Sequence, residues 1–139
     1  MTPPYAHIAC CIDDSPAAER VLEHARGLWS PAEGRLSIVH VGPRPLLVHE
    51  VGGRTVPRPE DLSAAERAWL RRRAAAVPGA EAVFLEGLPG PAACAWAQEA
   101  GVDLLVTAAH HGLLDRLLLG SFAQHLVNHA SCPVLVVRL

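Results

Sequence analysis

The stretch HIACCIDDSPAAERVLEHA, residues 7–25, passes from a strand pattern through a turn into a helix pattern. Its first six residues (7–12) form a short uninterrupted apolar run, which is typical of a strand buried on both faces. Asp14 or Ser15 then supplies a helix N-cap, and Pro16 suits the first turn. Apolar residues follow at helical spacing, namely Val21, Leu22, Ala25 and Leu28. The stretch therefore predicts a buried strand followed directly by a helix.

The same alternation continues to the end of the chain. Residues 42–59 are rich in Pro and Gly and predict a long loop. Strands separated by helices run parallel, with right-handed crossovers, in a sheet that helices cover on both faces. The predicted fold class is therefore α/β, with a single doubly wound sheet of five parallel strands. The further strands are expected at 36–41, 82–87, 102–108 and 133–139, and the further helices at 60–77, 91–100 and 120–129.

Length and charge favour one domain and exclude several classes of protein. The chain has 139 residues, half of them apolar, and a formal net charge of −2. It therefore has no electrostatic attraction to nucleic acid or to anionic lipid. No apolar run approaches the roughly 18 residues needed to cross a bilayer, and the first residues lack the basic start of a signal peptide. We expect a cytoplasmic protein with no nucleic-acid or membrane partner.

The use of basic residues and of cysteine narrows the chemistry further. All 12 basic residues are Arg and none is Lys, which excludes a Walker A lysine and a Schiff-base lysine. The four cysteines show no CxxC spacing. We expect buried thiols rather than disulfides or a metal site.

The carboxyl ends of the strands are where such sheets bind ligands. The residues that follow the first, second and fourth strands are therefore the candidates, at 13–15, 41–44 and 107–112. Asp13 ends an apolar strand and is expected to point into the crevice, where a carboxylate can hold a cation or accept a hydrogen bond from a ribose or a base. Asp14 is better explained as a helix cap.

Gly120 and Ser121 open the last predicted helix. The free N–H groups and the dipole at a helix N-terminus favour a phosphate, and glycine allows close approach of the backbone. Ordinary N-capping by Ser121 is the alternative interpretation.

The histidines and the serines give no clear catalytic or metal-binding pattern. His125 and His129 have the i, i+4 spacing of metal ligands, but no Cys or carboxylate completes a ligand set, so no metal site is expected. His40 is expected in the core or at the edge of the crevice. The G-x-S-x-G motif is absent, and no residue is placed as a general base with an orienting partner. We expect no catalytic residues and at most slow hydrolytic activity.

Three segments resemble the universal stress protein family. They are CIDDSPAAERVLEHA (11–25), IVHV (38–41) and LLLGSFAQHLVNHASCPVLVVRL (117–139). The resemblance covers nearly the whole chain, is most specific in the C-terminal segment and implies one domain over 1–139. It also implies a role in the stress response and the Rossmann-like, adenine nucleotide alpha hydrolase-like fold, with strand order 3-2-1-4-5.

The nucleotide-binding branch of this family carries the motif G-x-x-G-x9-G-[ST] after the fourth strand. By resemblance, Asp13, Val41, Gly120 and Ser121 are nucleotide-site positions for ATP or AMP, with Mg²⁺ if ATP is bound. Thr107 and His110 stand at the positions of the first two motif glycines. They add bulk where glycine lets the backbone touch a ligand. A dimeric interaction module of the same family that binds no nucleotide is therefore the alternative.

The last predicted strand would leave an apolar edge on the sheet, which is a liability unless it is paired. The family pairs two copies of this strand across a two-fold axis. We therefore expect a homodimer centred on Val134, Leu135, Val136 and Val137.

A phospho-receiver domain is a more distant alternative. The acidic pair Asp13-Asp14 and the Thr107-Ala108 pair would suit it. However, the third strand ends in Glu86 instead of Asp, and the chain has no Lys for the position after the fifth strand.

Overall fold

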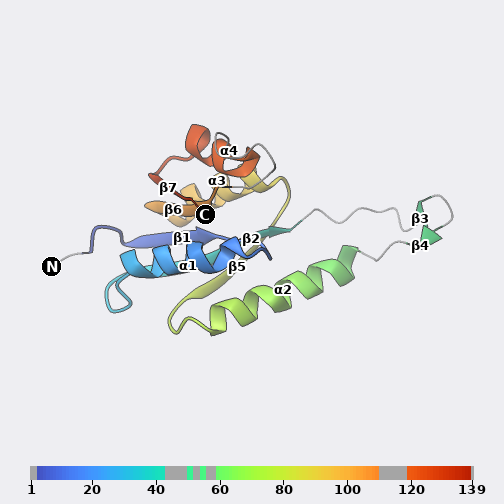
Figure 1. Ribbon diagram of the computed structural model, residues 1–139, viewed down its shortest axis with the longest axis horizontal. Helices are drawn as coiled ribbons and strands as arrows, with labels where there is room; N and C mark the ends of the chain where they lie inside the picture. Colours follow the sequence, from blue (N-terminus) through green and yellow to red (C-terminus); the bar gives the residue numbers. More distant parts are fainter. Residues whose placement is uncertain (1–2, 43–49, 52–53, 56–58, 110–118, 139) are drawn as a thin grey trace.

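A five-stranded parallel sheet forms the centre of the molecule (Figure 1). The computed structural model describes residues 3–42, 50–51, 54–55, 59–109 and 119–138. The strand order is β5-β2-β1-β6-β7, which confirms the predicted order 3-2-1-4-5 of the five main strands. These strands are β1 (His7–Cys11), β2 (Arg35–Gly42), β5 (Glu81–Glu86), β6 (Leu104–Ala108) and β7 (Val134–Val137).

Helices cover both faces of the sheet in the described part of the chain (Figure 1). On one face, α1 (Ala17–Leu28) and α2 (Pro59–Ala75) pack against the strands. On the other, α3 (Pro89–Ala100) and α4 (Ser121–His129) do so. All five residues of β1 are buried, because this central strand is covered from both sides.

Several element boundaries differ from the predictions. Helix α3 begins at Pro89 rather than at 91, because the proline ring has the backbone angle that the first helical turn needs. Within the predicted 42–59 loop, β3 (Glu50–Val51) pairs antiparallel with β4 (Arg54–Thr55), so the loop prediction was wrong for these residues. Residues 43–49, 52–53 and 56–58 lie outside the described part of the chain.

The predicted side-chain cap of α1 was also wrong. Pro16 occupies the N-cap position, and no side-chain hydrogen bond caps the helix within the described residues. Pro16 already has right-handed helical backbone angles, and the carbonyl of Ser15 accepts a hydrogen bond from the Ala18 N–H at 3.1 Å. A backbone turn therefore starts α1, and the side chains of Asp14 and Ser15 are not needed for it.

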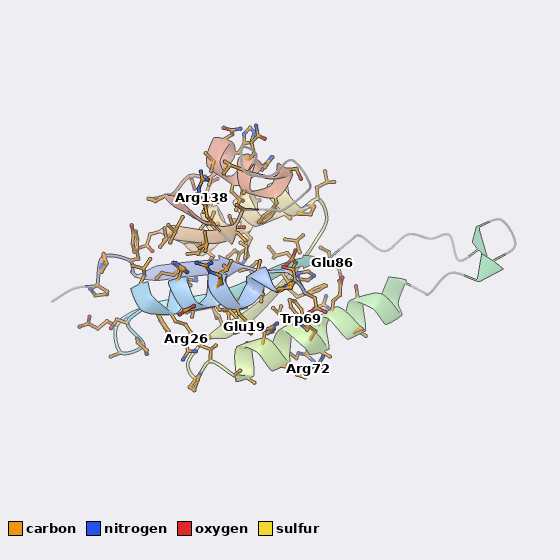
Figure 2. The ribbon with its side chains drawn as sticks, in the orientation of Figure 1. Glu19, Arg26, Trp69, Arg72, Glu86 and Arg138 are labelled. Carbon is orange, nitrogen blue, oxygen red and sulfur yellow. The ribbon has the colours of Figure 1, made fainter. Side chains whose placement is uncertain are left out.

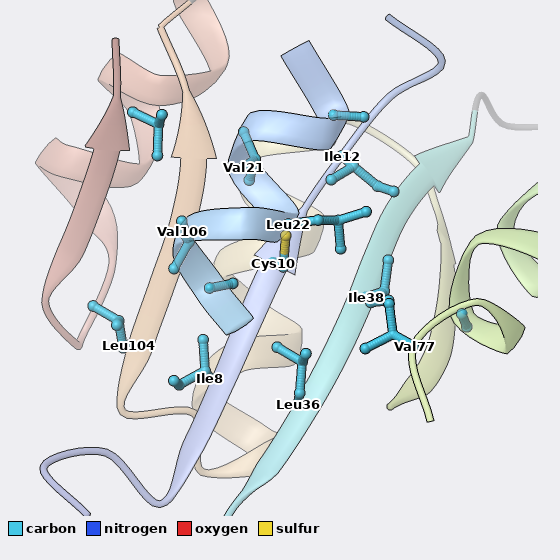
Figure 3. Close-up of a cluster of buried hydrophobic side chains, with 14 of the residues drawn as sticks. Ile8, Cys10, Ile12, Val21, Leu22, Leu36, Ile38, Val77, Leu104 and Val106 are labelled. Atoms are coloured by element: carbon cyan, nitrogen blue, oxygen red, sulfur yellow. The ribbon is translucent and has the colours of Figure 1, made fainter. Parts of the chain in front are cut away.

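The larger hydrophobic core lies between the sheet and the α1/α2 layer (Figure 3). Ile8 and Cys10 of β1 meet Leu36 and Ile38 of β2, and Val21 of α1 packs onto them. Burying one such Leu or Ile side chain contributes about 1.5–3 kcal/mol. A second core, with Ala9, Cys11, Val39, Leu105 and Leu126, lies under α3 and α4.

The four cysteines are free thiols, as predicted. Cys10 and Cys11 are buried as expected, but Cys94 and Cys132 are only half-buried, so the expected burial was wrong for these two. Burial raises the pKa of Cys11 to about 12, so this thiol is a packing group at neutral pH.

A polar network closes the amino end of the sheet. Asp103 accepts hydrogen bonds from the backbone N–H groups of Ala6 and His7, at 2.8 and 2.9 Å. His7 Nε2 lies 2.7 Å from Ser37 Oγ, which in turn donates to Glu81 Oε1 at 2.6 Å. Ser37 gives its proton to Glu81 and can therefore accept from Nε2 of His7, while Nδ1 of the same ring faces the carbonyl oxygen of Ala100 at 3.3 Å. Both ring nitrogens of His7 are thus engaged.

Within the described ranges, no helix has both the length and the apolar character that crossing a membrane requires.

Replacing Gly90 or Gly27 with alanine should change the free energy of unfolding in opposite directions. A Cβ on Gly90 of α3 would lie 2.5 Å from Cγ of His125 on α4, so we expect Gly90→Ala to lower the free energy of unfolding by about 1–3 kcal/mol. A Cβ on Gly27 of α1 would meet no atom within 4 Å, so Gly27→Ala should raise it by about 0.5–1 kcal/mol. Urea denaturation measures both, and equal effects would contradict the close α3–α4 packing.

Acid should destabilise the fold through His7. Burial, and then the nearby Arg35 guanidinium, lower the pKa of His7. The unfolded chain therefore binds a proton at a higher pH than the folded chain does, and stability falls as the pH drops below about 6.5. We expect His7→Gln, which keeps a donor near the Nε2 position, to lose less stability than the wild type between about pH 7.5 and about pH 5.5.

The matched control for this experiment is His24→Gln, at an exposed histidine of α1. When urea denaturation is repeated at each pH, the unfolding free energy of this variant should change with pH as that of the wild type does. If the unfolding free energy of His7→Gln also changes with pH as in the wild type, His7 is not the source of the acid sensitivity.

Candidate functional site

A cleft of about 560 Å³ lies at the carboxyl ends of β1, β2 and β6. The first turns of α1 and α4 form its sides, and Pro89 of α3 contributes to its rim. Most of its walls are apolar side chains, including Ile12, Ala17, Val39 and Phe122. Pockets of about 300–1,000 Å³ that combine apolar walls with a few polar groups are typical small-molecule sites.

Asp13 supplies the carboxylate of the cleft. It is exposed and follows Ile12 directly, just beyond the end of β1. The N–H of Ile12 donates to the carbonyl of Val39 at 2.9 Å, so pairing with β2 continues one residue past the strand. Asp13 therefore begins from a fixed backbone and presents its charge to the cleft.

The N-terminus of α4 is the second polar feature of the cleft. Gly120 is the N-cap, with φ 81° and ψ 156°, a conformation that favours glycine. Within the described residues no side-chain hydrogen bond caps this helix, so the alternative that Ser121 is an ordinary N-cap was wrong. The N–H groups of the first turn have no partner within the helix, and Ser121 and Phe122 of that turn line the cleft.

The other predicted site residues are divided between the cleft and the undescribed part of the chain. Val41 and Thr107 both line the cleft, so the structure brings them together with Asp13 and Ser121. Thr107 is buried at the end of β6, and the cleft persists beside it although this side chain replaces a glycine of the motif. His110 lies outside the described residues.

His40 lies at the edge of the cleft, as predicted, and is anchored on two sides. Its Nδ1 is 2.9 Å from the carbonyl oxygen of Ile12, and its Nε2 is 3.7 Å from Oε1 of Glu66 on α2. No feature of the sequence singles out Glu66, because this glutamate is one of several charged residues on a predicted helix. Only the packing of α2 against β2 brings its carboxylate to His40.

The histidine pair of α4 packs against α3. The rings of His125 and His129 are 4.4 Å apart between centroids, and His125 packs against Gly90 of α3. Among the residues that the structure describes, no group of three or more His, Cys, Asp or Glu could hold a metal ion.

The cleft can thus accept a flat apolar group, a hydrogen-bond donor and an anion together. The apolar walls suit a ring, the Asp13 carboxylate suits an N–H or O–H donor, and the N-terminus of α4 suits an anion.

Comparison with known proteins agrees over nearly the whole chain. The model of the "Universal stress protein family" matches residues 4–138. Universal stress protein A homolog 1 of Coxiella burnetii is 30% identical over 142 residues, which cover 96% of each chain.

Two solved structures share the fold. The universal stress protein UspA from Lactobacillus plantarum matches with a TM-score of 0.74 at 23% identity, covering 96% of this chain and 98% of that one. An Arabidopsis thaliana universal stress protein family protein with AMP bound matches with a TM-score of 0.61 at 18% identity, covering 96% and 91%. The sheet order is that of the adenine nucleotide alpha hydrolase-like fold. The chain belongs to the universal stress protein family.

Proposed function

We propose that this protein binds an adenine nucleotide, AMP or ATP, in the cleft at the carboxyl ends of β1, β2 and β6. The observation that carries the proposal is that the Asp13 carboxylate and the uncapped N-terminus of α4 line one cleft of about 560 Å³. AMP in the Arabidopsis relative, a protein of the same family, supports this choice of ligand.

Each end of the nucleotide has a suitable partner. The base and ribose lie between apolar side chains such as Ile12 and Val41, with Asp13 accepting a hydrogen bond from an N–H or O–H group. The phosphate lies at Gly120 and Ser121, where free N–H groups and the helix dipole favour negative charge. Thr107 lines the cleft between the site for the base and ribose and the site for the phosphate. Mg²⁺ accompanies the phosphates if ATP is the ligand.

The proposed role is regulatory binding in a stress response, not rapid turnover of the nucleotide. Among the described residues that line the cleft, His40 supplies an imidazole, and its Nδ1 is already engaged by the backbone of Ile12. Such a ring holds structure in place and is poorly available as a general base.

Binding should depend on Asp13 and not on its neighbour. We expect AMP or ATP to bind the wild type in isothermal titration calorimetry with and without Mg²⁺. Asp13→Asn should weaken binding about tenfold or more, the effect of losing a hydrogen bond to a charged acceptor. Asp14→Asn is the matched control, because Asp14 is also exposed but does not line the cleft.

Two outcomes would contradict this assignment. If the Asp13 and Asp14 variants bind the nucleotide with equal affinity, the proposed contact with Asp13 is wrong. A wild type that binds neither nucleotide would favour the interaction module without nucleotide.

We also propose that two copies pair through the edge strand β7. This strand is last in the sheet order, and Val134, Leu135 and Val136 are only half-buried. The carbonyls of Pro133 and Val137 accept hydrogen bonds from β6. Because alternate residues of a strand direct their N–H and C=O groups to opposite sides, those of Val134 and Val136 point to the open edge, where a second copy can pair with them.

A proline at 136 should therefore prevent dimerisation and spare the fold. Val136→Pro removes the outward N–H and leaves the bonds to β6 in place. Val136→Thr keeps the N–H and the branched shape and serves as the control. Sedimentation of the wild type and Val136→Thr should show dimers and that of Val136→Pro monomers, with equal circular dichroism. A monomeric wild type would refute the pairing.

A further inference from the structure

His40 holds the peptide that leads into Asp13. Its Nδ1 lies 2.9 Å from the carbonyl oxygen of Ile12. A carbonyl oxygen only accepts, so Nδ1 carries the proton and donates it. The N–H of the same residue donates to Val39 at 2.9 Å. Both polar groups of the Ile12 backbone are therefore held by β2, one by the strand itself and one by the His40 ring.

Packing on the other side of the ring fixes its orientation. The ring meets Trp69 of α2 edge-on, with 5.2 Å between centroids, and Phe84 of β5 at 6.0 Å. The Arg67 guanidinium lies 4.2 Å above the centroid of Phe84 and forms an ion pair with Glu86 at 3.2 Å. Figure 2 shows Trp69 between α2 and the sheet, and Arg72 on the outer side of the helix. The imidazole is thus held between the cleft and α2.

Glu66 completes the arrangement from α2. Its Oε1 lies 3.7 Å from Nε2 of His40, and its Oε2 is buried with no hydrogen-bond partner in the part of the chain that the structure describes. The 3.7 Å separation is longer than a hydrogen bond, so Glu66 lies beside Nε2, the ring nitrogen that does not face Ile12, without bonding to it.

We propose that His40 is a positioning residue of the cleft, one that fixes the Asp13 backbone through its Nδ1–H while its ring is held by packing against Trp69 of α2. The inference rests on the proposed binding of an adenine nucleotide at this cleft. Asp13 is exposed, so the position of its side chain depends on the backbone before it. The His40 ring holds that backbone through the carbonyl of Ile12. Because His40 holds this backbone before the ligand arrives, less conformational entropy is lost when the nucleotide binds to Asp13. His40 itself contacts Ile12 and not the nucleotide.

Two variants of His40 separate its two nitrogens. In His40→Asn the amide nitrogen lies near the place of Nδ1 and can still donate to Ile12. In His40→Gln it lies near the place of Nε2 and cannot. We expect His40→Asn to bind AMP with nearly wild-type affinity and His40→Gln to bind about tenfold more weakly, as calorimetry measures. Equal losses in both variants would overturn the positioning role.

A measurement without ligand keeps this inference distinct from the nucleotide proposal. Nitrogen-15 NMR of the wild-type protein should show Nδ1 of His40 protonated at neutral pH, and an unprotonated Nδ1 would overturn the inference even if no variant folds. Amide exchange at Ile12 should be faster in His40→Gln than in His40→Asn. If Ile12 exchanges faster in His40→Gln than in His40→Asn but AMP fails to bind the wild type, the nucleotide proposal fails and the anchoring of Ile12 stands. If AMP binds the wild type but the two variants exchange Ile12 at the same rate, the anchoring fails and the nucleotide proposal stands.

Discussion

Burial of β1 on both faces is the constraint on which the rest of the structure depends. This strand lies between β2 and β6, and its five residues are removed from water by helices on either side. Because β1 and β6 lead to helices on opposite faces of the sheet, α1 and α4 diverge and leave room above the strand ends. The cleft is therefore a consequence of the topology, and its chemistry is set by whichever residues stand at those ends.

Much of the architecture could be predicted, because periodic burial leaves a strong pattern in the sequence. The apolar run 7–12 and the helical spacing after Pro16 indicated β1 and α1 with nearly the correct limits. Local backbone choices were harder. The start of α1 at a backbone turn, the start of α3 at Pro89 and the β3–β4 pairing depend on short-range geometry that several sequences could satisfy.

The residues of the cleft that lie at strand ends or at a helix start could be predicted from the sequence. Those that are brought there by the packing of separate elements could not. Asp13, Val41, Thr107 and Ser121 line the cleft as their positions after strands or at a helix start implied, while their role as ligand contacts stays a prediction. Glu66 could not be found in this way. It reaches His40 across two elements that are distant in the chain, and Gly42 makes room for it, since a Cβ there would lie 2.7 Å from Glu66 Oε2.

The two ends of the sheet differ in how completely their polar groups are satisfied. At the amino end, both oxygens of Asp103 are engaged by backbone N–H groups, and Ser37 joins His7 to Glu81. At the carboxyl end, the Asp13 carboxylate is exposed, and within the described residues no side chain caps α4. The groups that hold the strands together and the groups that line the cleft therefore lie at opposite ends of the sheet. Substitutions at the carboxyl end can change the chemistry of the cleft while the amino end keeps the strands in register.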